Sequence, residues 1–471
     1  MCCQVGGATG QVTIHPEELM DATTAHLVDF ALSSDYTQLP EPCVHECKRR
    51  LIDTFACAIG AYEHPVSRMA REMARTSQGT PPASVWGCGW HTTAEAAAFA
   101  NGVMLRLDDA NDGYRVKSGG HPSDVIAGIV AIAEAVHADG RALIDAVTLA
   151  YDVYCSCCEV IDLNTKGWDQ PVYSVVATVL GAGKLLGLSR EQMAEAVALA
   201  LVPNMALIQT RRGDLSAWKG CAGANASRNA VFAALLAQKG FTGPTAAFEG
   251  QSGLWDAVGR FDWRVHVGPD APHRITHTLL KCFPVCGHGQ SPAAAAIEMR
   301  SRVRLGDITA IRVETYAHGK EEMGSDPSRW APTTRETADH SMPYVVVVGL
   351  LDGEITPASF SDARLADPAI HELIKKVEVV VSPDLSARFP ESWSCRLHVS
   401  MAGGPPVSVE VANPKGHISN PISDSELDGK FRGMWKGYGD ERQCAAALDA
   451  LWSFETVDDV AQMLKLFVVR N

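Results

Sequence analysis

The spacing of apolar residues changes twice along the chain, and this change constrains the fold more than any other feature. From about Thr24 to Leu280, apolar residues recur at helical spacing, with Gly or Pro between the runs. From Asp307 the runs are short, rich in β-branched residues and alternate with period two, as in ITAIRVETYAH. After Gly416 the helical spacing returns. The chain is therefore expected to be mostly α, with an inserted α+β unit.

This pattern predicts a discontinuous all-helical domain plus a smaller α+β domain inserted as a lid. The first helical part is expected over residues 24–277, the lid over 278–417 and the C-terminal helical part over 418–471. Within the lid, helices are expected at Pro292–Arg300 and Tyr344–Asp352, and strands in ITAIRVETYAH, KKVEVVVSP, SCRLHVSMAG and PVSVEVA. Ser423, with Glu426 three residues later, is a capping-box signature for a helix in the last part.

Charge and hydropathy exclude several classes of protein. The net charge of −14 argues against a nucleic-acid partner, which would need a basic face. A local pocket of Lys, Arg and His can still bind an anionic substrate. No stretch reaches about 18 apolar residues, so no membrane partner is expected. The first 21 residues lack the basic and apolar regions of a secretory signal, so a cytoplasmic protein is expected.

The segment from Asn101 to Ile126, NGVMLRLDDANDGYRVKSGGHPSDVI, concentrates ionisable residues beside helical sequence. Pro122, flanked by Ser123 and Asp124, is typical of a helix start, because these residues accept or spare the first N–H groups. His121 is then expected just before a helix N-terminus, where the dipole favours anions. An imidazole and a carboxylate at this position can transfer a proton next to a bound anion. The same residues are also consistent with a capped surface loop whose charged side chains are solvated.

Four motifs in one order resemble the MmgE/PrpD family. They are the Asn101–Ile126 segment, WKG at 218–220 with NASR at 225–228, LKCFP at 280–284, and RETADHSMPYVVVVGLLDGEI at 335–355. The last motif is similar to the 2-methylcitrate dehydratase branch, and the flanking chain is family-like from about Ala25 to Arg432. The resemblance implies an all-helical domain with a smaller lid, and a homodimer through the helical domain is expected.

The resemblance also implies the residues of an active site. Dehydration of a hydroxy acid needs a base for the proton α to a carboxylate, and cations that neutralise that carboxylate. His121 is the expected base or acid, the two lysines are expected to hold carboxylate, and Tyr344 is expected at the pocket mouth. The catalytic set is His121, Asp109, Lys219, Lys281, Tyr344 and His288, and the substrate-binding set is Gln170, Arg212 and Ser123.

Simpler structural roles fit several of these residues. The two lysines could be surface cations that extend from helices. Tyr344 lies in an apolar run, as a packed core tyrosine would. Asp109 could pair with Arg106 or Arg115, and His340 is as consistent with a structural role as with a catalytic one.

The chain departs from the family pattern at several positions. Gln170 stands where many relatives have a His, so proton transfer at that position is lost. Cys286 stands where the decarboxylase branch has a His, whereas His288 matches the dehydratase branch. Ala110 and Gly113 are smaller than the usual residues, which implies a roomier pocket and a substrate that need not be 2-methylcitrate.

The 14 cysteines are scattered along the chain. A disulfide framework is not expected in a leaderless chain with a large core. Cys155, Cys157 and Cys158 cluster, but no CxxCxxC or CxxC…CxxC arrangement is present, so an iron–sulfur site of the aconitase kind is the weaker alternative. Most thiols are expected to be small core hydrophobes, and neither cofactor nor metal is expected.

The leading hypothesis is a cofactor-independent lyase that dehydrates a small, 2-methylcitrate-like hydroxy-polycarboxylate. A cis-aconitate-type decarboxylase, or an isomerase or epimerase on the same scaffold, is the second enzyme hypothesis; Gln170 and Cys286 count against the decarboxylase. A catalytically inactive relative that serves as a binding protein is the third. An argument against it is the joint presence of Asp109, His121, Lys219, Lys281 and Tyr344.

Overall fold

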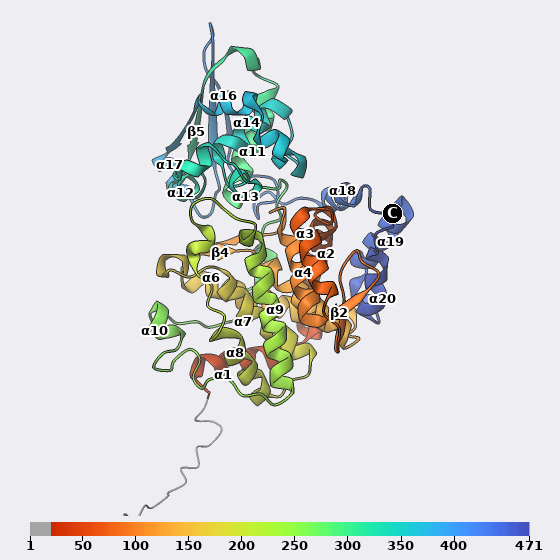
Figure 1. The fold of residues 1–471 in the computed structure, drawn as a ribbon. Helices are drawn as coiled ribbons and strands as arrows, with labels where there is room; N and C mark the ends of the chain where they lie inside the picture. The colour runs from red at the N-terminus through yellow and green to blue at the C-terminus, as the bar shows by residue number, and fades with distance from the viewer. Residues whose placement is uncertain (1–19, 471) are drawn as a thin grey trace, which may run out of the picture.

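The computed structural model describes residues 20–470, in which a large helical part lies beside a smaller part that contains a sheet (Figure 1). The expectation about a secretory signal falls mainly on residues 1–19, outside the described residues. Within residues 20–470, no helix is both long and apolar enough to cross a membrane. The first helical stretch comprises α1 (Ala22–Ser33), α2 (Glu41–Gly60), α3 (Pro65–Arg75), α4 (Ala94–Arg106), α5 (Ile126–Ala135), α6 (Gly140–Val160), α7 (Pro171–Leu185), α8 (Arg190–Leu201), α9 (Trp218–Gln238) and α10 (Leu254–Val258).

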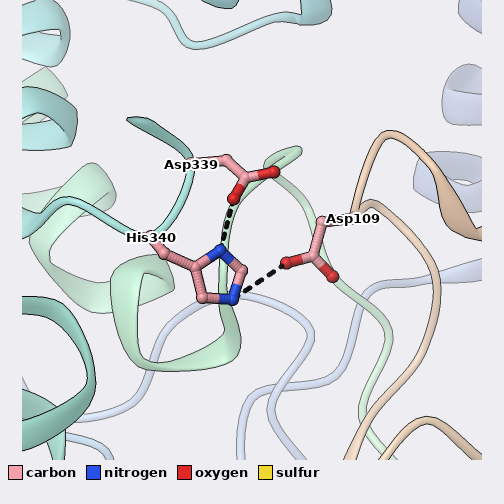
Figure 2. A group of neighbouring side chains, drawn as sticks. All are labelled: Asp109, Asp339 and His340. Carbon is pink, nitrogen blue, oxygen red and sulfur yellow. Dashed lines mark hydrogen bonds and ion pairs between the residues drawn. The ribbon is translucent and has the colours of Figure 1, made fainter. Parts of the chain in front are cut away.

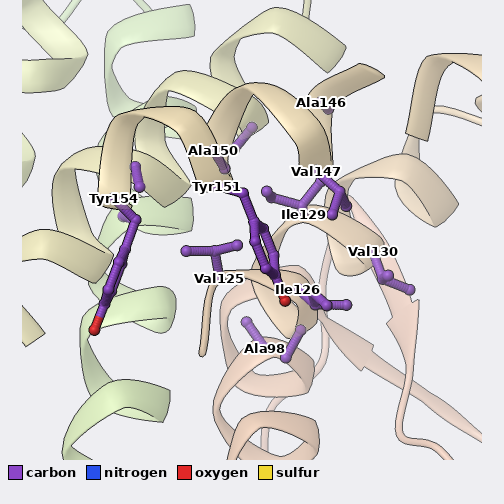
Figure 3. Packing of buried hydrophobic residues seen from close by; sticks show 14 of the residues in the cluster. Ala98, Val125, Ile126, Ile129, Val130, Ala146, Val147, Ala150, Tyr151 and Tyr154 are labelled. Atoms are coloured by element: carbon purple, nitrogen blue, oxygen red, sulfur yellow. The ribbon is translucent and has the colours of Figure 1, made fainter. Parts of the chain in front are cut away.

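Small side chains allow the central helices of this part to approach closely. A Cβ added to Gly102 of α4 would lie 2.8 Å from the Cβ of Ala224 of α9. Figure 3 shows the buried interior, where Ile126 of α5 and Tyr151 of α6 point into the same cluster. Dense packing of this kind leaves little room for volume changes, so these helices form a rigid base for the loops at their ends.

Two short hairpins interrupt the helices. β1 (Pro82–Ser84) pairs with β2 (His91–Thr93), and β3 (Tyr114–Arg115) pairs with β4 (Gly119–Gly120), both antiparallel. At Gly120, an added Cβ would lie 1.7 Å from Oε1 of Gln170 and 2.2 Å from the hydroxyl of Tyr154, so a larger residue would displace these side chains. The second hairpin therefore delivers the next residue, His121, to a defined position.

The smaller part is a four-stranded sheet covered by helices on one face. The strand order is β6-β5-β7-β8, with β5 and β6 parallel and the other pairs antiparallel. Alternate residues of β5 are buried, including Ile311 and Val313, while Arg312 and Glu314 lie on the more exposed face. The strands are β5 (Ile308–Thr315), β6 (Val377–Val381), β7 (Cys395–Met401) and β8 (Val407–Val411). The four strands predicted from period-two runs are therefore present.

The helices of this part are α11 (Gln290–Arg300), α12 (Ala317–Gly324), α13 (Arg335–Ala338), α14 (Met342–Asp352), α15 (Asp362–Leu365), α16 (Pro368–Ile374) and α17 (Pro383–Arg388). Helix α11 packs on β7 and β8, and α14 packs on α11. Two helices were predicted here, and both begin two residues earlier than expected. Pro343 occupies the first turn of α14, and the Ser341 side chain accepts from the N–H of Tyr344, which caps the helix upstream.

The C-terminal helices return to the helical part. They are α18 (Asp424–Trp435), α19 (Glu441–Trp452) and α20 (Val460–Leu464). Helices α18 and α19 contact α2, and α20 contacts α5, and Figure 1 shows all three beside the helical part. The capping box of Ser423 and Glu426 is present. These contacts are those expected of a discontinuous helical unit, and the boundaries at 277 and 417 stay a prediction.

Candidate active site

Asp109 is a buried carboxylate surrounded by cations. It follows the C-terminal end of α4 with a φ of +50°, a conformation that Asp tolerates better than most residues. One oxygen, Oδ1, accepts from Lys281 Nζ at 2.7 Å and from Arg106 at 2.5 Å. The other, Oδ2, accepts from Lys219 Nζ at 3.0 Å. Two lysines that are distant in the sequence therefore meet at one carboxylate.

The charge state of this group follows from its neighbours. Burial alone would raise the pKa of Asp109, but Lys219, Lys281 and Arg106 hold it well below its ordinary value. Burial lowers the pKa of Lys219, against the opposing attraction of Asp109 and Asp339. Asp109 is therefore a permanent anion that positions the lysines.

His121 lies beside this cluster, at the end of the β3–β4 hairpin. Its Nε2 is 3.8 Å from Oδ1 of Asp109. Its Nδ1 lies 2.7 Å from the backbone carbonyl of Asp112. Because a carbonyl only accepts, Nδ1 carries the proton and Nε2 is left with a free lone pair. Burial, reinforced by Arg106 and Lys281, lowers the pKa of His121 well below its ordinary value, so this imidazole is neutral.

His340 approaches Asp109 from the sheet-containing part (Figure 2). Its Nε2 is 3.8 Å from Oδ2 of Asp109, and its Nδ1 donates to Asp339. Burial and Lys219 would lower the pKa of His340, but Cys286 and Asp339 together raise it above its ordinary value. The site therefore contains two imidazoles whose surroundings shift their pKa values in opposite directions.

Asp109, Asp339 and His340 offer ligand atoms within 4.8 Å of one another, a spacing that suits a metal ion. The oxygens of Asp109 are already bound by the ammonium groups of Lys219 and Lys281. A divalent cation at this point would meet two lysines at close range, and the repulsion disfavours it. The donor set fits proton transfer and anion binding better than metal binding.

A cavity of about 210 Å³ opens next to this cluster, lined by residues from both the helical and the sheet-containing part. Asp109, His121, Lys281 and His340 are among its lining residues. Within residues 20–470, three arginines line it without an ion pair to any carboxylate: Arg115, Arg212 and Arg329. Carboxylates also line the cavity, among them Asp162, Glu321 and Glu322, so the anionic groups of a ligand are favoured locally, at the unpaired arginines.

Some expected site residues line the cavity and others stand behind it. His288 lines the cavity, and its Nδ1 lies 2.6 Å from the hydroxyl of Tyr316. Gln170 also lines it, but its Oε1 accepts from the backbone N–H of His121 at 2.8 Å. Ser123 is buried outside the lining, and its hydroxyl accepts from Asn111 at 2.8 Å. Gln170 and Ser123 therefore hold the local structure around His121.

Lys219 and Tyr344 are not among the residues that line this cavity. Lys219 is buried outside the cavity lining, between Asp109 and Asp339 at 3.0 and 3.8 Å. Tyr344 is fully buried in the smaller part, where its hydroxyl donates to the carbonyl of Ser359 at 2.8 Å. The expected position of Tyr344 at the pocket mouth is corrected, because α14 turns this residue into the apolar core beside Phe360.

The cysteine cluster lies inside α6. Cys155, Cys157 and Cys158 are buried, and burial raises the pKa of all three thiols. This favours the protonated form, which neither binds metal nor reacts. These residues pack as the small hydrophobes that the sequence predicted.

Asp339, Arg115 and Arg329 were not identified as site residues from the sequence. A signal was present for Asp339, since a carboxylate directly precedes His340 in the RETADHS motif. No comparable signal marked the two arginines. Arg115 is placed by β3 and Arg329 by a short turn before α13, and only the folded chain brings them to one cavity.

Two models of one protein family match successive parts of the chain. The model of the MmgE/PrpD N-terminal domain matches residues 25–264, and that of the MmgE/PrpD C-terminal domain matches residues 283–454. The chain belongs to the MmgE/PrpD family. The resemblance of the four motifs is thereby confirmed.

Relatives in this family share about a quarter of their residues with the chain. A 2-methylcitrate dehydratase of Cupriavidus necator is 28% identical, over 78% of this chain and 80% of the relative. A cis-aconitate decarboxylase of Aspergillus terreus is 23% identical, over 94% and 95%. An alkylcitrate dehydratase of a fungal species is 24% identical, over 89% and 88%. The chain is thus similar over most of its length to enzymes with more than one named activity.

Proposed function

We propose that the protein is a hydro-lyase that dehydrates a small hydroxy-polycarboxylate related to 2-methylcitrate. The observation that carries this proposal is the pair of imidazoles at one cavity, His121 neutral and His340 with a raised pKa. Two titratable groups with opposite shifts suit a base and an acid in one reaction. The names of the relatives, which include 2-methylcitrate and alkylcitrate dehydratases, support the same reaction class.

In this mechanism His121 is the general base. Its Nε2 has a free lone pair and takes the proton from the carbon α to a substrate carboxylate. The substrate carboxylate resists this step unless its charge is neutralised, and Lys281, which lines the cavity, can supply that neutralisation. The unpaired arginines bind the remaining carboxylates and orient the substrate.

His340 is the general acid. Asp339 accepts from its Nδ1 and stabilises the protonated ring, so Nε2 can donate a proton towards the cavity. The hydroxyl leaves as water with this proton, and the electron pair left by the α-proton forms the C=C bond. Asp109 stays ionised and keeps both imidazoles and both lysines in place.

The test is an assay of the full chain with a panel of hydroxy acids, including 2-methylcitrate, citrate and malate. The expected result is an increase in ultraviolet absorbance from the enoate product with a tricarboxylate, and no release of CO2. CO2 release from cis-aconitate would instead indicate a decarboxylase. Exchange of the α-proton without enoate formation would indicate an epimerase, and the absence of any reaction would leave a binding role.

A further inference from the structure

Cys286 is a cavity residue that the proposed mechanism does not use. It lies between the LKCFP motif and His288, and it lines the same cavity as His121 and His340. Its backbone N–H donates to the carbonyl of Asp339 at 3.0 Å. This bond joins the segment that carries Cys286 to the segment that carries His340, so the two side chains are held together.

The thiol, the imidazole and a carboxylate are connected in series. His340 donates from Nδ1 to Asp339, which leaves Nε2 as the nitrogen available to the thiol. Cys286 and His340 line the same cavity, and the bond from the Cys286 backbone to Asp339 keeps their segments together. Burial would raise the pKa of Cys286, but the neighbouring His340 outweighs burial and lowers this pKa below its ordinary value. A thiol next to an imidazole that a carboxylate orients has the arrangement of an activated nucleophile.

A neighbouring cysteine provides an internal comparison. Cys282 lies four residues earlier and is more exposed than Cys286. Burial nevertheless raises the pKa of Cys282, and this residue does not line the cavity. If solvent exposure determined reactivity, Cys282 would react first. If the position beside His340 determines it, Cys286 reacts first.

The surroundings of Cys286 also define the kind of reagent that can reach it. Arg115, Arg212 and Arg329 line the cavity without carboxylate partners within residues 20–470. Arg329 is only 4% exposed, and its Nε has no hydrogen-bond partner within that part of the chain. A small anion is therefore favoured beside the thiol over a neutral reagent of the same size.

We propose that Sγ of Cys286 is a covalent modification site for small anionic α,β-unsaturated carboxylates. In the thiolate–imidazolium form of the pair, the proton lost by the thiol is already on Nε2 of His340, and sulfur forms a bond to the β-carbon of the enoate. The π pair of the C=C bond moves to the α-carbon, which takes the proton back from His340, and a stable thioether results. The step is an addition that needs no oxidant or further reactant. It rests on the proposed function only in that dehydration would generate such an enoate in this cavity.

The experiment treats the full chain with fumarate, a small dianionic enoate, and separately with acrylamide, a neutral one. Peptide mapping by mass spectrometry then compares labelling of Cys286 with that of Cys282. Fumarate is expected to label Cys286 faster than Cys282 on the order of tenfold, because the thiolate is the reactive form and a cluster of cations raises the local concentration of an anionic reagent by about that factor or more. Acrylamide is expected to discriminate less, because it gains nothing from the arginines.

Two variants make the test specific. Cys286→Ser should abolish the fumarate adduct, whereas the matched variant Cys282→Ser should leave it unchanged. His340→Gln should slow labelling of Cys286 and leave that of Cys282 unaffected. Two results would overturn the proposal. The first is fumarate labelling that favours Cys282 in the unmodified chain. The second is labelling of Cys286 at the same rate in His340→Gln as in the unmodified chain.

The result is independent of whether the enzyme turns over a hydroxy acid. Labelling of Cys286 without dehydration of any acid would support the modification site and count against the proposed function. Dehydration without labelling of Cys286 would support the function and overturn the modification site.

Discussion

Asp109 shows how one residue organises the chemistry of the site. It binds Lys219, Lys281 and Arg106 directly, and both imidazole Nε2 atoms lie 3.8 Å from it. A buried carboxylate without these partners would be costly, and the cations without the carboxylate would repel one another. The carboxylate and the cations therefore stabilise one another, and together they fix the positions of the two imidazoles.

The opposite shifts of the two imidazoles predict a bell-shaped pH dependence of kcat/KM. His121 must be neutral, so activity falls as pH drops through its pKa, below 6.5. His340 must be protonated, so activity falls as pH rises through its pKa, above 6.5. His121→Gln should lower kcat by about 100- to 10,000-fold, and His340→Gln should remove the basic limb. Steady-state rates from pH 5 to about 9 measure both effects.

Asp124 provides the control for this assignment. Burial raises the pKa of Asp124 to about 7, so it titrates in the same range. Its carboxylate lies behind Gln170, whose Nε2 donates to Oδ2 of Asp124 at 3.3 Å, and it does not line the cavity. Asp124→Asn should therefore preserve the basic limb. A basic limb that disappears in Asp124→Asn and persists in His340→Gln would contradict the role given to His340.

At the scale of elements, the approach of α4 and α9 sets the distance between Asp109 and Lys219. Helix α4 ends three residues before Asp109, and Lys219 lies in the first turn of α9. Gly102 faces Ala224 where these helices touch. The glycine of the Asn-Gly pair that begins the first motif therefore has a packing role, because any side chain there would push the helices apart.

Gly102→Ala should destabilise the protein by about 1–3 kcal/mol, the usual cost of overpacking a dense core. The matched control is Gly429→Ala in α18, where an added Cβ would meet nothing within 4 Å. That change should stabilise by roughly 0.5–1 kcal/mol, since glycine is a poor helix former. Urea unfolding midpoints measure both. Equal effects of the two substitutions would mean that contact between α4 and α9 does not limit stability.

At the scale of the whole molecule, the C-terminal helices contribute to the site. Lys430 of α18 donates from Nζ to Asp53 of α2 at 2.6 Å. The same ammonium group binds the carbonyls of Ala110 and Lys281 at 2.7 and 2.8 Å. One side chain near the end of the chain thus joins α2, the loop after Asp109 and the LKCFP segment.

Lys430→Met should destabilise the protein by about 3–5 kcal/mol, because it leaves Asp53 buried without its partner. The control is Lys436→Met, at an exposed position just after α18, which should change stability by less than about 0.5 kcal/mol. Thermal and urea unfolding measure the difference. If Asp53→Asn in the Lys430→Met background failed to recover stability, the loss would not come from the uncompensated carboxylate.

The sequence by itself determined the mostly helical architecture, the four strands and the family. Period and turn residues are local properties, so the alternation that predicts β5 and the capping box of α18 can be read without the fold. The motifs also contain Asp109, His121 and Lys281, which the structure brings together at one cavity, because residue types and their order are a property of the chain.

Only the tertiary structure decided which side chains meet and in what charge state. Tyr344 and Lys219 stand in the motifs but outside the cavity lining. Arg115, inside the first motif, and Arg329, outside all four, line the cavity although no binding role was predicted for either. The neutral His121 and the raised pKa of His340 depend on burial and on charges from distant segments. The direction in which a side chain points and its electrostatic environment are both set by the packing of distant segments. The local sequence therefore does not predict either of them.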